Sequence, residues 1–313
     1  MLVLTREDVA SLLDLDALVD ALAAAFTDLS AGRVSMPPRI AAFSGHGLLG
    51  VMPAYLPSAN LLETKLVTLF EGNAGTDLPT HQAAIAVFDP ERGAMTALMD
   101  GTYITATRTA AGSALSTRLL AREDARVLAI CGTGVQAQTH VRAVSRMRPF
   151  EEIRIAGRDR GKAGALAAEV GGIAVDSFEQ AVRGADVVSA TTHSAEPVVR
   201  HEWLAPGTHV TSVGINPEGA ELEERLVADA DVFVESREAV LAPFPAGAND
   251  LRGLDAERLT ELGEVLAGTR PGRLNAEQVT VYKSVGVGVM DAAAAALVLE
   301  AAAERGAGTE IEL

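Results

Sequence analysis

The sequence predicts an α/β fold in which a Rossmann-type, doubly wound parallel sheet is joined to a second, α+β domain. Two observations predict it. From residue 126 onward, short apolar runs alternate with segments of helical composition, which is typical of a parallel sheet covered by helices on both faces. In addition, a chain of 313 residues is longer than one hydrophobic core usually supports, so we expect two domains.

The first part of the chain predicts a mixed domain of helices and strands. Apolar residues at helical spacing over 15–29 predict an amphipathic helix that ends near Gly32. Residues 33–80 are rich in proline and glycine, which favours short strands and irregular loops. Two strand-like runs, 83–88 and 94–99, are separated by a segment of hairpin length, and a helix over 109–120 follows.

The second part predicts the parallel sheet. Helices are expected to begin at Val135 and Asp159, and the alternation ends near Tyr282. Residues 284–304 then predict a long helix that returns to the first domain. The expected strands cover residues 127–131, 153–156, 187–192, 210–214 and 232–235.

These patterns also place the domain boundaries. We expect one domain to comprise residues 1–120 and 290–313, and the Rossmann domain to comprise residues 121–289. No internal repeat or low-complexity linker separates them.

Composition excludes several classes of partner. The 26 Lys and Arg against 42 Asp and Glu give a net charge of −16, which repels nucleic acid and anionic membranes. A single cysteine, Cys131, excludes an intrachain disulfide, and the N-terminus lacks a secretory signal, so we expect a cytoplasmic protein. The six histidines show no metal-ligand spacing, and no metal is expected.

A glycine fingerprint follows the first strand of the predicted sheet. Gly132 permits a tight turn, Gly134 allows the backbone to approach a pyrophosphate, and Ala137 allows the next helix to pack closely. The strand before it and the helix after it favour dinucleotide binding over a purely structural turn. The candidate cofactor-binding residues here are Gly132, Thr133, Gly134, Val135, Gln136 and Ala137.

The tip of the second strand bears on the choice of cofactor. The strand ends at Ala156-Gly157, where an NAD site usually has an acid for the ribose 2′-hydroxyl. Arg158 and Arg160 follow, and an arginine suits a 2′-phosphate, so NADP(H) is favoured over NAD(H). Asp159 leaves an alternative open, because it either holds the ribose or caps the next helix.

Several short motifs occur along the whole chain in the order seen in one protein family. The motifs are Met52-Pro53, residues 63–67, 98–101 and 105–111, the glycine fingerprint, and residues 190–192, 203–207 and 283–286. By these motifs the chain resembles the ornithine cyclodeaminase/μ-crystallin family, which includes alanine dehydrogenases, ketimine and cyclic-imine reductases and a lens crystallin that binds NADPH. The resemblance implies a dinucleotide-dependent enzyme with an amino or imino acid substrate, whose first domain binds substrate and forms a homodimer.

By this resemblance, Arg39, Lys65 and Arg108 hold the substrate carboxylate and act at its α-carbon, with Met52 beside them. The chemistry is reasonable, because guanidinium groups pair with carboxylates and a desolvated lysine can exchange a proton. The alternatives are a surface position for Arg39, a solvated strand position for Lys65 and a salt bridge at a helix N-terminus for Arg108. The resemblance also places near the cofactor Thr80, Thr191, Thr192, His193, Val213, Ser284 and Gly286, although His193 equally suits an exposed loop.

Two departures from the family pattern bear on the reaction. Ornithine cyclodeaminases carry an acid just before the Met-Pro pair, where this chain has Gly50-Val51. They also carry an aspartate where this chain has Asn216, which we keep as a candidate catalytic residue. Both acids serve the substrate's amino groups and ring closure, so their absence disfavours cyclodeamination.

The function we expect is therefore reduction of a cyclic or linear α-imino acid, with Lys65 or a water that it orients as the proton donor. Three alternatives stay open. The first is an ornithine cyclodeaminase that uses bound NAD⁺, and the second is an alanine-type dehydrogenase. The third is a cofactor-dependent binding protein without turnover.

Overall fold

The computed structural model describes residues 1–312 and separates into two compact units. Unit 1 contains Met1–Arg108 and the segment from Val287 onward, and unit 2 contains Thr109–Gly286. The division falls inside helix α3 (Gly101–Leu120), not at the expected residue 120. This helix begins eight residues before the expected residue 109, because Asp100 accepts a 2.7 Å hydrogen bond from the amide of Tyr103 and so starts it.

Unit 1 is built on a seven-stranded sheet with the order β15-β1-β6-β5-β4-β3-β2. Only the β1–β6 pair is parallel among its described pairs. The strands are β1 (Leu2–Leu4), β2 (Ile40–Phe43), β3 (Leu48–Leu56), β4 (Leu61–Leu69), β5 (His81–Phe88), β6 (Met95–Asp100) and β15 (Thr309–Glu310). The helices are α1 (Arg6–Leu12), α2 (Leu15–Ser30) and α10 (Gly288–Arg305), with the 3₁₀ turns η1 (Pro57–Ala59) and η2 (Glu71–Asn73).

The predicted hairpin is confirmed as β5 and β6, but the expectation of short strands over residues 33–80 was wrong for β3 and β4. Strands β3 and β4 have nine residues each, and Pro53 lies inside β3. Alternate residues of β3, such as Met52 and Ala54, are buried, with exposed fractions of 4% and 1%. Burial of this alternating face outweighs the local effect of the proline.

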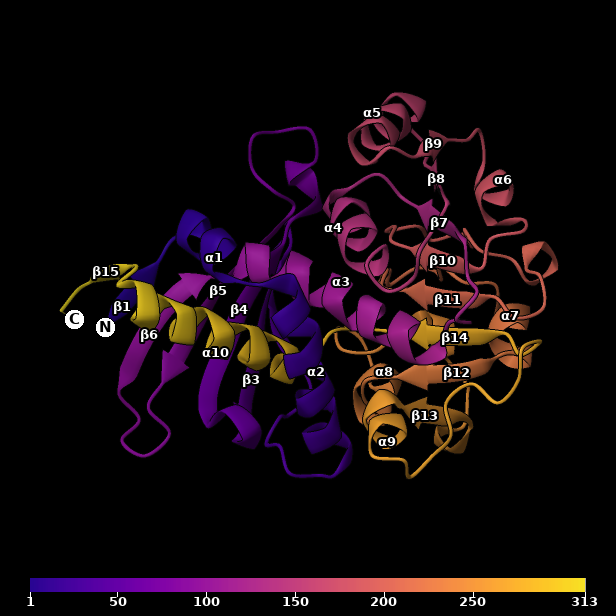
Figure 1. Ribbon diagram of the computed structural model, residues 1–313. Helices are drawn as coiled ribbons and strands as arrows, with labels where there is room; N and C mark the ends of the chain where they lie inside the picture. Colours follow the sequence, from indigo (N-terminus) through magenta and orange to yellow (C-terminus); the bar gives the residue numbers. More distant parts are fainter. Residues whose placement is uncertain (313) are drawn as a thin grey trace. The chain divides into compact units, whose positions relative to one another are not determined.

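Helix α10 lies across one face of this sheet, next to α2 (Figure 1). A Cβ atom at Gly288 would come within 2.9 Å of the Ala54 Cβ, so glycine allows the first turn of α10 to approach β3 closely. The helix begins four residues after the expected residue 284, because Gly286 has a left-handed backbone with φ of +71°. The face of the sheet under α10 carries the odd-numbered residues of β4.

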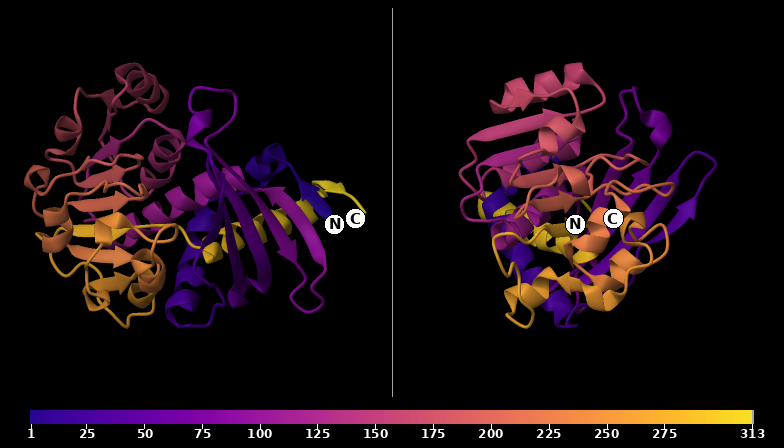
Figure 2. Two further views of the ribbon diagram at one scale, coloured as in Figure 1. Left: turned by 180° about the vertical axis from the view of Figure 1, so that it is seen from behind. Right: turned by 90° about the vertical axis from the view of Figure 1, so that its right-hand side faces the viewer.

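The opposite face of the sheet, called here the outer face, is apolar and partly exposed. Ile40, Leu49 and Leu66 keep 65%, 41% and 38% of their surface exposed. They lie on neighbouring strands β2, β3 and β4. The view from behind in Figure 2 shows these strands of unit 1 with α10 beyond them.

Unit 2 contains an eight-stranded sheet, all parallel, with the order β13-β12-β14-β11-β10-β7-β8-β9, and confirms the Rossmann-type fold class (Figure 1). The strands are β7 (Val127–Cys131), β8 (Glu152–Ala156), β9 (Ile173–Ala174), β10 (Val187–Ala190), β11 (His209–Ser212), β12 (Asp231–Val234), β13 (Leu259–Glu261) and β14 (Thr280–Lys283). The helices are α4 (Val135–Val144), α5 (Arg160–Val170), α6 (Phe178–Val182), α7 (Glu224–Asp229), α8 (Arg237–Leu241) and α9 (Leu262–Leu266). The 3₁₀ turns are η3 (His201–Trp203), η4 (Asn249–Leu251) and η5 (Ala256–Arg258).

Two buried histidines of unit 2 belong to a chain of polar contacts beneath α3. His140 Nε2 lies 3.0 Å from Ser113 Oγ, and His209 contacts Ser116 Oγ at 3.2 Å and Thr280 Oγ1 at 2.9 Å. Burial lowers the pKa of His140 to about 4 and that of His209 to about 3. Both imidazoles are therefore neutral near pH 7, and the fold depends on their staying so.

Residues 1–312 contain no helix that is long and apolar enough to cross a membrane. In the same residues, no group of three or more His, Cys, Asp or Glu side chains is arranged to hold a metal ion.

Candidate active site

Two of the predicted substrate-binding cations meet on one buried carboxylate in unit 1. Lys65 Nζ donates to Asp291 Oδ2 at 2.7 Å, and Arg108 Nε donates to Asp291 Oδ1 at 3.1 Å. The side chains are 1%, 4% and 0% exposed, respectively, for Lys65, Arg108 and Asp291. We call these three residues the clamp, because one acid holds both cations in place.

Local structure explains how the clamp forms. Alternation along β4 turns Lys65 toward α10, whose first turn carries Asp291. Because α3 begins at Gly101, Arg108 lies within a helix and not at a helix N-terminus. The alternatives of a solvated strand lysine and a helix-terminal salt bridge are therefore wrong for Lys65 and Arg108.

The protonation of the clamp follows from burial and charge. Burial and then the nearby Arg108 lower the pKa of Lys65 to about 7, although Asp291 opposes this shift. Burial opposes ionisation of Asp291, but Arg108 and Lys65 hold the pKa of that carboxyl below its usual value. Because Arg108 continues to neutralise Asp291, Lys65 can lose its proton without leaving the carboxylate unpaired. Lys65 is thus able to give and take a proton near neutral pH.

The other predicted substrate residues surround Lys65. Met52 on β3 is the direct cross-strand neighbour of Lys65, and the charge of Arg39 contributes to lowering the pKa of Lys65. A Cβ atom at Gly50 would lie 3.7 Å from Arg39 Cδ, so Gly50 on β3 is next to this arginine. Burial and the charge of Lys65 lower the pKa of His81 to about 4, so His81 is neutral beside these cations.

A further acid of this region, Glu63, was missed by sequence reasoning. It precedes Lys65 by two residues on the same face of β4 and is 1% exposed. Neither carboxyl oxygen has a hydrogen-bond partner among residues 1–312. Burial, reinforced by Asp291, raises the pKa of Glu63 well above its usual value. Its spacing from Lys65 was the signal available in the sequence.

The glycine turn in unit 2 has the features of a dinucleotide cradle. Gly132 has φ of +135°, and a Cβ atom there would lie 2.5 Å from Thr191 Oγ1. Gly134 begins α4 with no side-chain cap, and the space at its Cβ position is open. The first amides of α4 are therefore free to bind an anion. Ala137 is fully buried, as its predicted packing role requires.

The tip of β8 lies against this turn. The amide of Gly132 donates to Ala156 O at 2.8 Å, and a Cβ atom at Gly157 would lie 2.5 Å from Thr133 Cγ2. Asp159 caps α5 by accepting from the amide of Lys162 at 3.0 Å, which matches the capping alternative.

The two arginines at this tip have different surroundings. Arg160 forms an exposed ion pair with Asp176 at 3.0 Å, and Arg158 is exposed.

A buried acid, Glu221, organises the carboxyl ends of β10 and β11. Its Oε1 accepts from Thr192 Oγ1 at 2.8 Å and also from the Thr192 amide. Its Oε2 accepts from Ser212 Oγ at 2.8 Å and from the Gly214 amide at 2.9 Å. Because Glu221 takes these amides, both strands end two residues before the expected positions. Lys283 Nζ bonds to Ser212 Oγ at 2.9 Å and to Asp250 at 2.8 Å.

The remaining predicted residues are held by protein contacts. Asn216 donates to His193 O at 3.0 Å and accepts from the Glu218 amide at 2.8 Å, so it braces the loop after β11. Ser284 Oγ and the Gly286 amide both donate to Glu235. The other contacts are those of the Val213 amide with Ala190 O at 3.2 Å and of Thr80 O with the Phe70 amide at 2.8 Å.

Neither Glu221 nor Asp291 was predicted. For Asp291, the available signal was a single acid in an otherwise apolar, Ala-rich stretch of helix.

Comparisons with known proteins identify relatives of this chain over nearly its whole length. The sequence model of the Ornithine cyclodeaminase/mu-crystallin family matches residues 1–306. The chain is 40% identical over 287 residues, 90% of each protein, to the ketimine reductase mu-crystallin of Mus musculus. A solved structure of Thermococcus litoralis Δ1-pyrroline-2-carboxylate reductase in complex with NADH and L-proline matches with a TM-score of 0.93, at 33% identity over 99% of this chain and 100% of that one. An archaeal alanine dehydrogenase dimer with bound NAD matches with a TM-score of 0.92, at 30% identity over 100% and 99% of the two chains.

Proposed function

Since this chain belongs to the ornithine cyclodeaminase/mu-crystallin family, we propose that it reduces a cyclic or linear α-imino acid with a nicotinamide dinucleotide, or oxidises the matching L-amino acid. The observation that carries this proposal is the clamp. It combines a lysine able to exchange a proton near pH 7 with an arginine fixed beside it. The names of the reductases to which the chain is similar support the same reaction class.

In this proposal, different residues of unit 1 bind the substrate and transfer the proton. Arg108 and Arg39 hold the substrate carboxylate, for which guanidinium groups are suited. Lys65, held by Asp291, gives a proton to the substrate nitrogen as the carbon is reduced. A bound NAD(P)H supplies the hydride to that carbon. The buried position of Lys65 keeps bulk water away from the proton that it carries.

The residues of unit 2 fit a dinucleotide. We propose that the amides at the start of α4, with Gly132 and Gly134, hold the pyrophosphate. We further propose NADP(H) over NAD(H), because Asp159 is engaged as a helix cap and Arg158 is exposed at the strand tip. The solved relatives described above contain NADH and NAD, so the preference for the phosphorylated form is a specific property proposed for this chain.

The test is a substrate panel assayed by the absorbance of the reduced nicotinamide. We expect consumption of NADPH with a cyclic imino acid such as Δ1-pyrroline-2-carboxylate. Turnover only with a 2-oxo acid plus ammonia identifies an alanine-type dehydrogenase instead. Release of ammonia from ornithine without net change in absorbance identifies a cyclodeaminase. That reaction is disfavoured because residue 216 is an asparagine and not an acid. Binding of NADPH without any turnover identifies a binding protein.

We also propose that the chain forms a homodimer through the outer face. Its partly exposed Ile40, Leu49 and Leu66 form an apolar surface that a second copy would cover. The dimer in the structure of an archaeal relative supports this choice of partner. Sedimentation at micromolar concentration is expected to show a dimer, and Leu66→Arg is expected to give a monomer. A wild-type protein that sediments only as a monomer contradicts the proposal.

A further inference from the structure

Glu63 lies at a buried position whose surroundings suit an apolar side chain. It is 1% exposed, and both of its oxygens lack a hydrogen-bond partner among residues 1–312. Its cross-strand neighbours are Ala54 on β3 and Val87 on β5, both buried and apolar. An unpaired buried carboxyl destabilises a fold, so its presence beside Lys65 calls for a functional reason.

Charged groups face Glu63 from three elements. Lys65 lies on the same face of β4, two residues away, which places the two Cβ atoms about 7 Å apart. Asp291 faces it from α10 and Arg108 from α3, and their charges act on Glu63 with opposite signs. The neighbouring positions on β3 and β5 carry no charge. Burial and Asp291 both raise the pKa of Glu63, so they favour its protonated, neutral form over a second carboxylate.

A neutral acid beside the proton donor has a specific use. When Lys65 has given a proton to the substrate nitrogen, it is a neutral amine shielded from bulk water. We propose that Glu63 then reprotonates Lys65. The O–H bond of the Glu63 carboxyl breaks, and its proton bonds to the lone pair of Lys65 Nζ. The products are a Glu63 carboxylate and a Lys65 ammonium, and the carboxylate later takes a proton from water.

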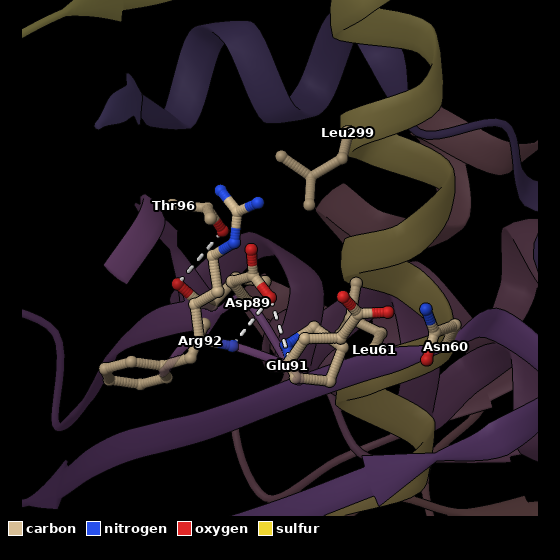
Figure 3. Close-up of a pocket in the computed structure, with 10 residues that line it drawn as sticks. Asn60, Leu61, Asp89, Glu91, Arg92, Thr96 and Leu299 are labelled. Atoms are coloured by element: carbon tan, nitrogen blue, oxygen red, sulfur yellow. Dashed lines mark hydrogen bonds between the residues drawn. The ribbon is translucent and has the colours of Figure 1, made fainter. Parts of the chain in front are cut away.

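An open hollow supplies a route for that last proton. It has a volume of about 540 Å³ and lies at the end of the β4–β5 face that is away from Lys65. Val87, the direct neighbour of Glu63 on β5, lines it, as does Leu61. Figure 3 shows the acidic side chains of Asp89 and Glu91 in this hollow, below Leu299 of α10. The hollow therefore reaches the direct neighbour of Glu63 on β5, at the end of the face away from Lys65.

This inference rests on the proposed function, and its first test does not need turnover. Infrared difference spectra of the wild type and Glu63→Gln near pH 7 are expected to show a carboxylic acid C=O band that only the wild type contains. Glu63→Leu is expected to raise the melting temperature, because it removes an unpaired buried polar group. Asp28→Asn is the matched control, since Asp28 is a buried acid of the same unit that pairs with Arg33.

The second test separates the first turnover from later ones. In Glu63→Gln, hydride transfer in a single turnover at about pH 6 is expected to keep its wild-type rate, because Lys65 is already protonated below its pKa of about 7. Steady-state kcat at about pH 8 is expected to fall at least about 10-fold with KM unchanged, and Glu63→Asp is expected to restore part of it. Asp28→Asn is expected to leave both rates unchanged.

Three results would overturn the inference. They are absence of the acid band from the wild type, unchanged steady-state kcat in Glu63→Gln, and equal loss of the single-turnover and steady-state rates. The last result indicates a structural role. If the wild type shows the band but reduces no imino acid, the proposed function fails, and the reprotonation of Lys65 by Glu63 fails with it. The neutral state of Glu63 would still stand.

Discussion

Asp291 is the residue whose replacement tests the clamp most directly. In the protein, its two oxygens separately hold Lys65 at 2.7 Å and Arg108 at 3.1 Å. The change Asp291→Asn keeps the size of the side chain and removes its charge. Lys65 then faces Arg108 and Arg39 without a counter-charge, so its pKa must fall below the present value of about 7.

The expected size of the effect follows from that pKa. Loss of an opposite charge at contact distance lowers a lysine pKa by about 1–3 units. At pH 7 the protonated fraction of Lys65 is then reduced from about one half to between about a tenth and about a thousandth. Imine reduction requires the protonated form, so kcat is expected to fall about 5-fold to about 500-fold at pH 7. The free energy of unfolding is also expected to fall by about 3 kcal/mol, because two buried cations lose their partner.

The assay is the pH dependence of kcat for imine reduction. In the wild type kcat should decrease as pH rises through about 7, and in Asp291→Asn the same decrease should occur at a lower pH. Activity of the variant should therefore recover as the solution is acidified. Asp28→Asn, which alters a buried acid paired to Arg33 elsewhere in unit 1, should leave the profile unchanged. A variant whose kcat is reduced equally at every pH would refute the reasoning.

Three further predictions follow from the same structure. Lys65→Ala should lower kcat by about 10²–10⁴-fold with cofactor affinity nearly unchanged, and Lys65→Arg should not restore it, because guanidinium does not release its proton near neutral pH; wild-type kcat in either variant removes Lys65 from the mechanism. Arg158→Glu should weaken the preference for NADPH over NADH by about 1.5–3 kcal/mol in calorimetric titrations, and an unchanged ratio contradicts the assigned role. His140 and His209 have folded pKa values of about 4 and about 3, below the value of about 6.5 for an unfolded histidine. Their stabilisation is complete above that unfolded value and is lost as pH falls toward the folded ones, so their combined contribution to the free energy of unfolding should be about 3–4 kcal/mol lower at pH 5 than at pH 7. In urea titrations His209→Gln should remove about half of this dependence.

The parts of the fold that were predicted correctly depend on local sequence. Strand β7 and the start of α4 lie where the apolar run and the glycine turn placed them. The errors occur where burial outweighs local preference. Pro53 is accommodated inside β3, and the threonines at 105, 107 and 109, which are poor helix formers, lie buried in α3.

The candidate site also contains residues that the sequence identified and residues that it did not. Lys65 and Arg108 stand in motifs of the family, so the sequence identified them. Their shared partner is separated from them by 226 and 183 residues, and no local pattern connects residues so distant in the chain. The spacing of Glu63 from Lys65 was visible in the sequence, but its unpaired state was not, because that state depends on what β3, β5 and α10 place around it.

The late position of α10 in the chain has a consequence for biosynthesis. Unit 2 is one continuous segment, whereas unit 1 is completed only by residues beyond 286. Lys65 and Arg108 leave the ribosome long before the acid that neutralises them, and burying both cations without it is unfavourable. We therefore expect the nascent chain to complete the parallel sheet of unit 2 before unit 1. Unit 1 can be completed only after α10 has emerged and β15 is available to pair with β1.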